Sequence, residues 1–241
     1  MVIFAILLGV LPSLIWLVFF LKEDAHPEPK GMLARVFIWG SVAALMAVIF
    51  QYFFQDILDF FKIGEYAFIS FFVLAAVEEV LKFAVVYATV NKSKFFDEPI
   101  DAMIYMITVA LGFAALENIF IASNGLLIGS FKNGEVFSIL TIRFAGATLF
   151  HALGAGIVGY YWARGSMRIA LTPASQSRNA NASMRINKSM IFKGLVIATF
   201  LHAVFNYSII VFKDVDILIY PLIFLIIIAL VVFKDFERVK I

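Results

Sequence analysis

Seven runs of about 20 mainly apolar residues dominate this 241-residue chain, and each run is long enough to cross a bilayer as a helix. They cover about 2–21, 33–54, 66–90, 100–123, 143–163, 191–212 and 217–233. Soluble domains are about half apolar and a quarter charged, whereas this chain is 63% hydrophobic and 15% charged. The sequence therefore predicts an all-α integral membrane protein of about seven transmembrane helices, forming a single polytopic domain over residues 1–241.

The segments between these runs differ in charge. If the N-terminus lies outside, 14 of the 19 Lys and Arg residues fall on the inner side, as positive-inside counting requires. Lys62, Lys132 and Lys213 fall in outer loops. This bias predicts a multi-pass protein of the plasma membrane with its N-terminus outside and its C-terminus inside. Residues 164–190 are predicted to form a polar loop in contact with anionic lipid, and no nucleic-acid-binding patch is evident.

Several familiar protease chemistries lack their signatures in this chain. No cysteine is present, which excludes a disulfide framework, a thiolate metal site and a cysteine nucleophile. The sequence also contains no Gly-x-Ser-Gly elbow, no Gly-x-Gly-Asp and no His-Glu-x-x-His. Serine, presenilin-type aspartyl and site-2 zinc proteases are therefore not indicated by their usual motifs.

Four of the predicted helices nevertheless carry polar side chains inside their apolar runs. In chain order these are Glu78, Glu79, Lys82, Glu117, Asn118, His151, His202 and Asn206. A charge inside the bilayer costs several kcal/mol, so an ionisable residue there is a functional hypothesis by default. Glu78 and Lys82 are four residues apart and share one helical face, as do His202 and Asn206. Each helix therefore presents one polar stripe.

These polar stripes are expected to meet in one layer. At 1.5 Å per residue the side chains lie roughly 9 to 18 Å from the predicted outer helix ends, although the helices run in opposite directions. The polar layer then lies between the middle of the bilayer and its outer face. Small residues flank it and allow helices to approach closely; they are Ala75, Ala76, Gly112, Ala114, Ala115, Gly154, Ala155 and Gly156.

Two hydrolytic chemistries remain open for such a set. A buried Glu can act as the general base on a water molecule, while His holds the water or protonates the leaving amine and Asn206 donates to the oxyanion. Alternatively, a Glu and two His ligate Zn²⁺, which lowers the pKa of a bound water. The residues do not decide between a metal-free mechanism and a zinc cofactor.

Other interpretations compete with hydrolysis. Glu79 and Lys82 could form a purely structural pair, and Asn118 could make a helix–helix hydrogen bond. Glu and His also line ion pathways, so a proton- or metal-coupled transporter is an alternative, although no inverted repeat of the kind common in transporters is visible. A non-enzymatic scaffold of the same fold is a third alternative.

Six motifs in chain order resemble the PrsW family of membrane proteases. They are His26-Pro27-Glu28-Pro29, Glu-Glu-x-x-Lys at 78–82, Asp97-Glu98-Pro99-Ile100-Asp101 followed by Tyr105, Phe-x-x-x-Glu-Asn at 113–118, His151 followed by small residues, and His-x-x-x-Asn at 202–206. The resemblance runs from about residue 20 to residue 210. It implies a multi-helix fold related to the CAAX prenyl protease and bacteriocin-processing group.

The resemblance also implies a reaction and roles for residues. The reaction is hydrolysis of a peptide bond in a single-span membrane protein of the anti-sigma-factor type. The catalytic set implied is Glu78, Glu79, Glu117, His151, His202 and Asn206, supported by Lys82 and Asn118. If a metal is present, its ligands would come from Glu78, Glu117, His151 and His202. Many relatives carry Asp where Asn206 stands, which weakens any assignment of position 206 as a metal ligand.

Overall fold

The computed structural model describes residues 2–127, 141–170, 187–211 and 219–240. Over these residues the chain forms seven long α-helices and no β-strand. The helices are α1 (Val2–Phe20), α2 (Lys30–Phe60), α3 (Phe68–Val90), α4 (Pro99–Leu127), α6 (Leu149–Ala170), α8 (Lys188–Val211) and α9 (Ile219–Val239). A short 3-10 helix, η1 (Leu21–Glu23), follows α1, and a π-helical turn, η2 (Phe144–Thr148), precedes α6. The all-α fold predicted from the sequence is confirmed.

Most of these helices suit a membrane by length and composition. Six helical segments in the described part of the chain are long and apolar enough to cross one. The remaining helix, α3, has 23 residues and would reach about 34 Å at 1.5 Å per residue. It carries the three charged residues Glu78, Glu79 and Lys82, and all three are buried. The polar face of α3 therefore points into the bundle, where α2, α4 and α8 pack against it.

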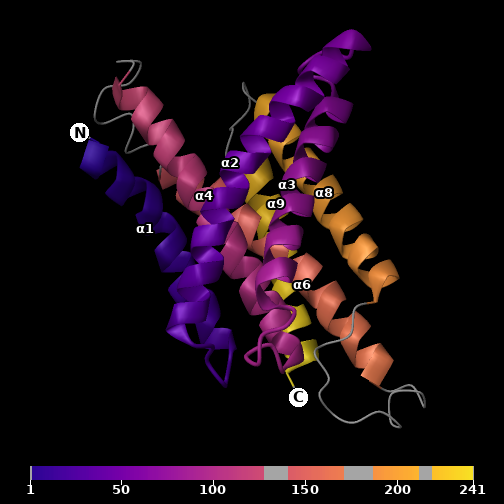
Figure 1. Cartoon of the computed structure of the whole chain (residues 1–241). Helices are drawn as coiled ribbons and strands as arrows, with labels where there is room; N and C mark the ends of the chain where they lie inside the picture. The colour runs from indigo at the N-terminus through magenta and orange to yellow at the C-terminus, as the bar shows by residue number, and fades with distance from the viewer. Residues whose placement is uncertain (1, 128–140, 171–186, 212–218, 241) are drawn as a thin grey trace.

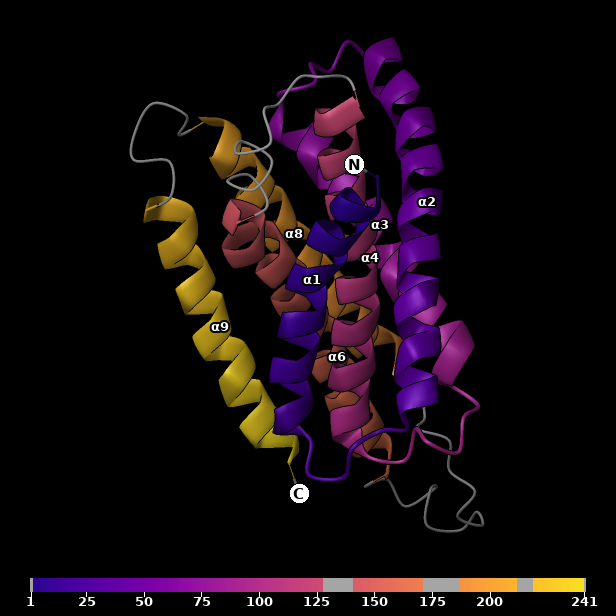
Figure 2. The same ribbon diagram turned by 90° about the vertical axis from the view of Figure 1, so that its left-hand side faces the viewer.

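Helix α4 forms the centre of the bundle. Helices α1, α2 and α6 all pack against it (Figures 1 and 2). Every residue from Asp101 to Ala115 is buried, which is the pattern of a helix enclosed by neighbours on all sides. Peripheral helices instead expose large apolar side chains such as Phe53 on α2 and Ile227 on α9. These exposed side chains form the surface that lipid would cover.

The closest backbone contact in the interior joins α2 to α4. A Cβ atom added to Gly112 would lie 1.9 Å from the carbonyl oxygen of Phe37, and one added to Gly40 would lie 2.1 Å from that of Val109. Both positions therefore require glycine, because small residues let membrane helices approach this closely. The Ser41 hydroxyl donates a hydrogen bond to the Gly112 carbonyl oxygen at 2.8 Å. This contact holds the Glu117 turn of α4 beside α2.

Some helices extend past the apolar runs that predicted them. Helix α2 spans Lys30–Phe60 rather than 33–54, and α9 continues to Val239 rather than ending at 233. The apolar run marks only the hydrocarbon core, whereas polar, basic and aromatic residues are favourable at the membrane interface. A helix can therefore continue beyond the run without cost.

The polar loop predicted for 164–190 is shorter than expected at both ends. Helix α6 continues to Ala170 and α8 begins at Lys188, for the same interfacial reason. The middle of this loop lies outside the described residues.

Replacing Gly112 with alanine is expected to destabilise the bundle. The new methyl group would overlap a backbone carbonyl that has no side-chain freedom to move, so the cost should be at the upper end of the roughly 1–3 kcal/mol typical of overpacking. Thermal unfolding of the purified protein in detergent measures it. Gly154→Ala is the matched control, because its Cβ would meet nothing closer than 3.7 Å. Equal melting temperatures for the two variants would contradict the close α2–α4 contact.

Candidate active site

The structure gathers polar side chains from four helices into one buried network. Helix α3 contributes Glu78, Glu79 and Lys82, α4 contributes Glu117 and Asn118, α6 contributes His151, and α8 contributes His202. Glu79 is 1% exposed and Lys82 is 0% exposed. Ionised groups this deeply buried must be paired with opposite charge and hydrogen-bonded, and the contacts described below provide that pairing.

Lys82 is the cation at the centre of the network. Its Nζ donates to Glu79 Oε1 at 2.8 Å and lies 3.6 Å from Glu78 Oε2. It also lies 3.0 Å from Nδ1 of His151, and 4.5 Å from the centre of the Phe113 ring, which is within range of a cation–π interaction. Lys82 thus offsets the negative charge of two neighbouring glutamates and links α3 to α4 and α6.

His202 is oriented by one glutamate and faces the other. Its Nδ1 lies 2.9 Å from Glu79 Oε1, and its Nε2 lies 3.8 Å from Glu78 Oε2. Glu79 as a carboxylate can only accept, so Nδ1 carries the proton and Nε2 of a neutral ring presents its lone pair. Glu78 Oε2 is buried and forms no hydrogen bond within the described residues. With a neutral ring, two acceptors face each other without a proton between them, and the nearest cation to Glu78 Oε2 among the described residues is Lys82 Nζ at 3.6 Å.

His151 is held in a comparable way by Glu117. The Nε2 atom of His151 lies 2.9 Å from Glu117 Oε2. Because the Lys82 ammonium can only donate, Nδ1 of a neutral His151 accepts from Lys82 and Nε2–H donates to Glu117. The His151 and His202 rings meet edge to face, with 5.1 Å between their centroids. Each imidazole thus has one ring nitrogen within hydrogen-bonding distance of a carboxylate oxygen.

Two side chains that the sequence analysis did not assign complete the network. Arg143, immediately before η2, donates to Glu117 Oε2 at 3.1 Å and to Asn118 Oδ1 at 2.6 Å. Gln51 on α2 donates to Glu78 Oε1 at 2.9 Å. Arg143 was recognisable as a charge at the start of an apolar run, and Gln51 as an amide inside another.

Asn118 links the network on α4 to two neighbouring segments of the chain. Its Nδ2 donates to Thr148 Oγ1 at 3.0 Å and to the backbone carbonyl of Gly9 at 3.4 Å. These bonds join α4 to η2 and α1, which matches the helix–helix hydrogen bond considered for Asn118. The π-helical turn that contains Thr148 is a type of irregularity that frequently occurs at functional sites.

Glu78, His151 and His202 could hold a metal ion. One ligand atom from each residue lies within 4.8 Å of the other two. Two imidazoles and one carboxylate form a donor set known from catalytic zinc sites. Glu117, which the sequence analysis included among possible ligands, contacts His151 Nε2 instead. It occupies the position of an outer carboxylate that orients a ligand.

Asn206 is the predicted site residue that lies apart from the network. It follows His202 by one turn of α8, or about 6 Å along the helix axis, and is half-buried. Within the described residues it makes no hydrogen bond to the glutamates or histidines. Its assignment to an oxyanion therefore stays a prediction.

A second group of carboxylates lies where α1 leads into α2, near the start of α4. Oxygen atoms of Asp24, Glu28 and Asp101 lie within 4.8 Å of one another. Tyr105 donates a hydrogen bond to Glu28, and burial raises the pKa of Glu28 above its usual value. Asp101 Oδ2 accepts from the backbone N–H groups that precede α4, at 2.9 Å and 2.7 Å. These contacts tie the connection to α4, consistent with a structural role.

Comparison with known proteins places these residues in a family context. The family model described as "PrsW family intramembrane metalloprotease" matches residues 28–233. Protease PrsW of Geobacillus kaustophilus is 30% identical over 163 residues, and that of Bacillus subtilis is 31% identical over 156 residues. Protease PrsW of Clostridioides difficile is 27% identical over 205 residues. No solved structure matches the chain.

These alignments cover much of each protein. They span 67%, 64% and 83% of this chain for the G. kaustophilus, B. subtilis and C. difficile proteins. They span 66%, 65% and 77% of those relatives, so the match reaches slightly less than two thirds of the first two.

Lys82→Met is expected to destabilise the protein strongly. It would leave Glu79 buried without its cation, and breaking a buried ion pair from one side costs about 3–5 kcal/mol. Thermal unfolding in detergent measures the loss, with exposed Lys92→Met as the control for removal of a lysine. The double variant Glu79→Gln/Lys82→Met removes both charges and should recover a large part of the loss. A double variant whose loss equals the sum of both single losses would contradict the pairing.

Proposed function

Because this chain belongs to the PrsW family of intramembrane metalloproteases, we propose that it hydrolyses a peptide bond in a membrane-anchored protein. The reacting water would lie between Glu78, His151 and His202. The observation that carries this proposal is the buried pair of facing acceptors, Glu78 Oε2 and His202 Nε2, 3.8 Å apart. Such a pair is stable only with a cation or a hydrogen-bond donor between the two atoms.

The donor set is compatible with a metal, as the family description "intramembrane metalloprotease" implies. Glu78 supplies an oxygen with no hydrogen bond among the described residues, and His202 supplies a free Nε2 lone pair. Ligation by His151 through Nδ1 would require Lys82 to give up its 3.0 Å contact and keep its bond to Glu79. A zinc ion bound by these three residues would lower the pKa of a bound water and polarise the substrate carbonyl.

Glu79 and Glu117 act in this proposal as positioning residues. Glu79 fixes the proton of His202 on Nδ1, which directs Nε2 toward Glu78. Glu117 accepts from His151 Nε2 and is itself held by Arg143. Carboxylates that accept from the second nitrogen of a histidine fix its orientation and raise its basicity. The orientations of both imidazole rings are thereby fixed before the substrate binds.

In the alternative without a metal, Glu78 is the residue proposed to receive the proton of the attacking water. Its Oε1 is occupied by Gln51, so Oε2 is the oxygen left for the reaction. The proton could then pass to the leaving amine, as general acid–base catalysis requires. Asn206, one turn beyond His202, is proposed to donate to the oxyanion that forms on the scissile carbonyl; its support is its place on α8.

The substrate class is inferred from the family resemblance, and the orientation of the chain in the membrane from its basic residues. A single-span protein of the anti-sigma-factor type is the substrate that the resemblance to PrsW proteases implies. The membrane face at which α6 ends carries most of the basic residues, which supports placing it on the inner side. The polar network would then lie nearer the outer face.

Glu78→Gln is expected to abolish cleavage of a co-expressed single-span substrate. The amide keeps the shape of the side chain but cannot accept a proton, and loss of general acid–base catalysis costs about 10²–10⁴-fold in rate. Cleavage is followed by immunoblotting of the substrate. Glu65→Gln is the control, because Glu65 is an exposed carboxylate before α3.

Two results would contradict the proposal. One is a Glu78→Gln variant that folds with an unchanged melting temperature and cleaves the substrate at the wild-type rate. The other is purified protein in liposomes that carries protons or metal ions across the membrane and cleaves no peptide, which would favour the transporter.

A further inference from the structure

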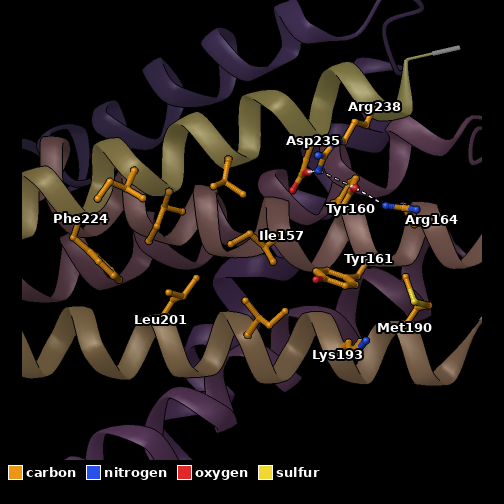
Figure 3. A pocket seen from close by; sticks show the side chains of 14 residues that line it. Ile157, Tyr160, Tyr161, Arg164, Met190, Lys193, Leu201, Phe224, Asp235 and Arg238 are labelled. Carbon is orange, nitrogen blue, oxygen red and sulfur yellow. Dashed lines mark hydrogen bonds and ion pairs between the residues drawn. The ribbon is translucent and has the colours of Figure 1, made fainter.

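A groove runs along the side of the bundle, away from the buried network. Helix α6 forms its floor, and α8 and α9 form its two walls (Figure 3). Its volume is about 530 Å³, which lies within the 300–1,000 Å³ range of small-molecule sites. The groove faces outward between two helices that lipid would surround. Its natural ligand would therefore arrive from the bilayer.

One end of the groove is basic. Arg164 on α6 and Arg238 on α9 lie beside the hydroxyl of Tyr160, and Lys193 lies on the facing α8 wall near Tyr161 (Figure 3). Arg164 Nη1 and Arg238 Nη1 lie 3.0 Å and 3.4 Å from that hydroxyl. One acidic residue, Asp235, lines the groove and pairs with Arg238 at 3.0 Å. Among the described residues this end therefore holds three basic side chains and one acidic side chain, which gives it a net positive charge.

Lys193 is the cation best placed to bind a ligand. It is exposed on the wall of the groove and forms no ion pair with any other described residue. Arg164 donates its hydrogen bond to a neutral hydroxyl and forms no ion pair within 4 Å of a described carboxylate, although Asp235 is near enough to attract it. The two arginine forks and the lysine together offer the donors that bind an anionic phosphate group.

The opposite end of the groove is apolar. Ile157 on α6, Leu201 on α8 and Phe224 on α9 line it (Figure 3), and Ile227 on the α9 wall is 56% exposed. An exposed apolar lining of this kind suits a hydrocarbon chain. The groove therefore changes from charged to apolar along its length, as an amphipathic ligand does.

The length of the groove matches one leaflet of a bilayer. Lys193 and Leu201 are eight residues apart on α8, or about 12 Å, and Phe224 and Arg238 are 14 residues apart on α9, or about 21 Å. One leaflet of hydrocarbon is about 15 Å thick. A substrate helix would cross both leaflets and would have to place apolar residues against the basic end. The dimensions and charge favour a phospholipid.

We propose that this groove binds one anionic phospholipid. Its phosphate would lie against Arg164, Lys193 and Arg238, and an acyl chain would lie along Ile157 and Phe224. Basic pockets between transmembrane helices are suited to anionic lipid head groups. The proposal is independent of the peptidase function, because the groove lies outside the Glu and His network. Bound lipid would brace α9 against α6 and α8.

Binding can be measured on the purified, delipidated full-length protein. Phosphatidylglycerol and phosphatidylcholine with identical acyl chains are titrated into detergent micelles, and bound lipid is counted by native mass spectrometry alongside the melting temperature. Phosphatidylglycerol should be retained and should raise the melting temperature, whereas phosphatidylcholine should do neither. Equal retention of both lipids would overturn the proposal, because the basic end would then play no part.

The double variant Arg164→Gln/Lys193→Gln tests the head-group site. Each basic residue near the membrane surface contributes about fivefold in affinity, so about 25-fold weaker retention of phosphatidylglycerol is expected. Lys92→Gln/Lys188→Gln is the matched control, since both lysines are exposed and outside the groove and the charge removed is the same. An equal loss in both double variants would indicate general surface attraction and would overturn the specific site.

Two further arms separate a lipid from a free phosphate compound. Ile227 is exposed on the groove wall, so Ile227→Trp should narrow the apolar end without disturbing the core. The variant should retain less phosphatidylglycerol, and its melting temperature in phosphatidylcholine should equal that of the wild type. Glycerol 3-phosphate carries the head-group chemistry without a chain and should produce no stabilisation. If glycerol 3-phosphate stabilises the protein as well as phosphatidylglycerol does, the site is a phosphate site and the lipid assignment is wrong.

Discussion

The ion pair between Lys82 and Glu79 lies where water can solvate neither charge. Both side chains are almost fully buried, and their Nζ–Oε1 distance is 2.8 Å. Either charge alone would carry a large desolvation penalty. Neither charge can therefore be buried without the other, and Glu78, His151 and His202 each contact one of the two partners. The structure of the site depends on this interaction more than on any other.

The helices can bring these partners together because their backbones approach closely. Helices α2 and α4 touch at Gly40 and Gly112. Gln51 on α2 reaches Glu78 of α3, and Glu117 on α4 reaches His151 of α6. The polar network in turn crosslinks helices that would otherwise be held by packing alone, since lipid tails are as apolar as the helix surfaces. Packing and charge pairing thus support each other in this bundle.

The sequence was sufficient to predict the fold class and the glutamates, histidines and lysine of the polar network, but not Gln51 or Arg143. Apolar runs of transmembrane length marked the helices, and each misplaced charge pointed to the interior because lipid cannot solvate it. The pairing could not be predicted in the same way. The spacing of these residues in the sequence does not indicate that Lys82 lies closer to Glu79 than to Glu78, or that Glu117 orients His151. Those choices depend on helix rotation and on rotamers, which packing determines.

Residues at the ends of the apolar runs were harder to assign. Arg143 stands beside a π-helical turn whose geometry has no simple sequence signature, so its contact with Glu117 and Asn118 was not foreseen. Helix ends were placed too early or too late where interfacial residues continue a helix, as at Phe60 of α2 and Ala170 of α6. Arg164 and Arg238 at the basic end of the groove belong to these continued turns, and Lys193 faces them from α8. The basic end therefore became visible only when the helices were assembled.

The central claim is that Glu78, His151 and His202 form a hydrolytic metal site inside the bundle. Its most direct test is metal analysis with zinc X-ray absorption spectroscopy on the purified protein, beside a cleavage assay in chelator. The account predicts one zinc ion per chain with two imidazole nitrogens and carboxylate oxygen as protein ligands, and loss of cleavage when the metal is removed. Full cleavage by metal-free protein would contradict the metal site and would assign the chemistry to Glu78 alone.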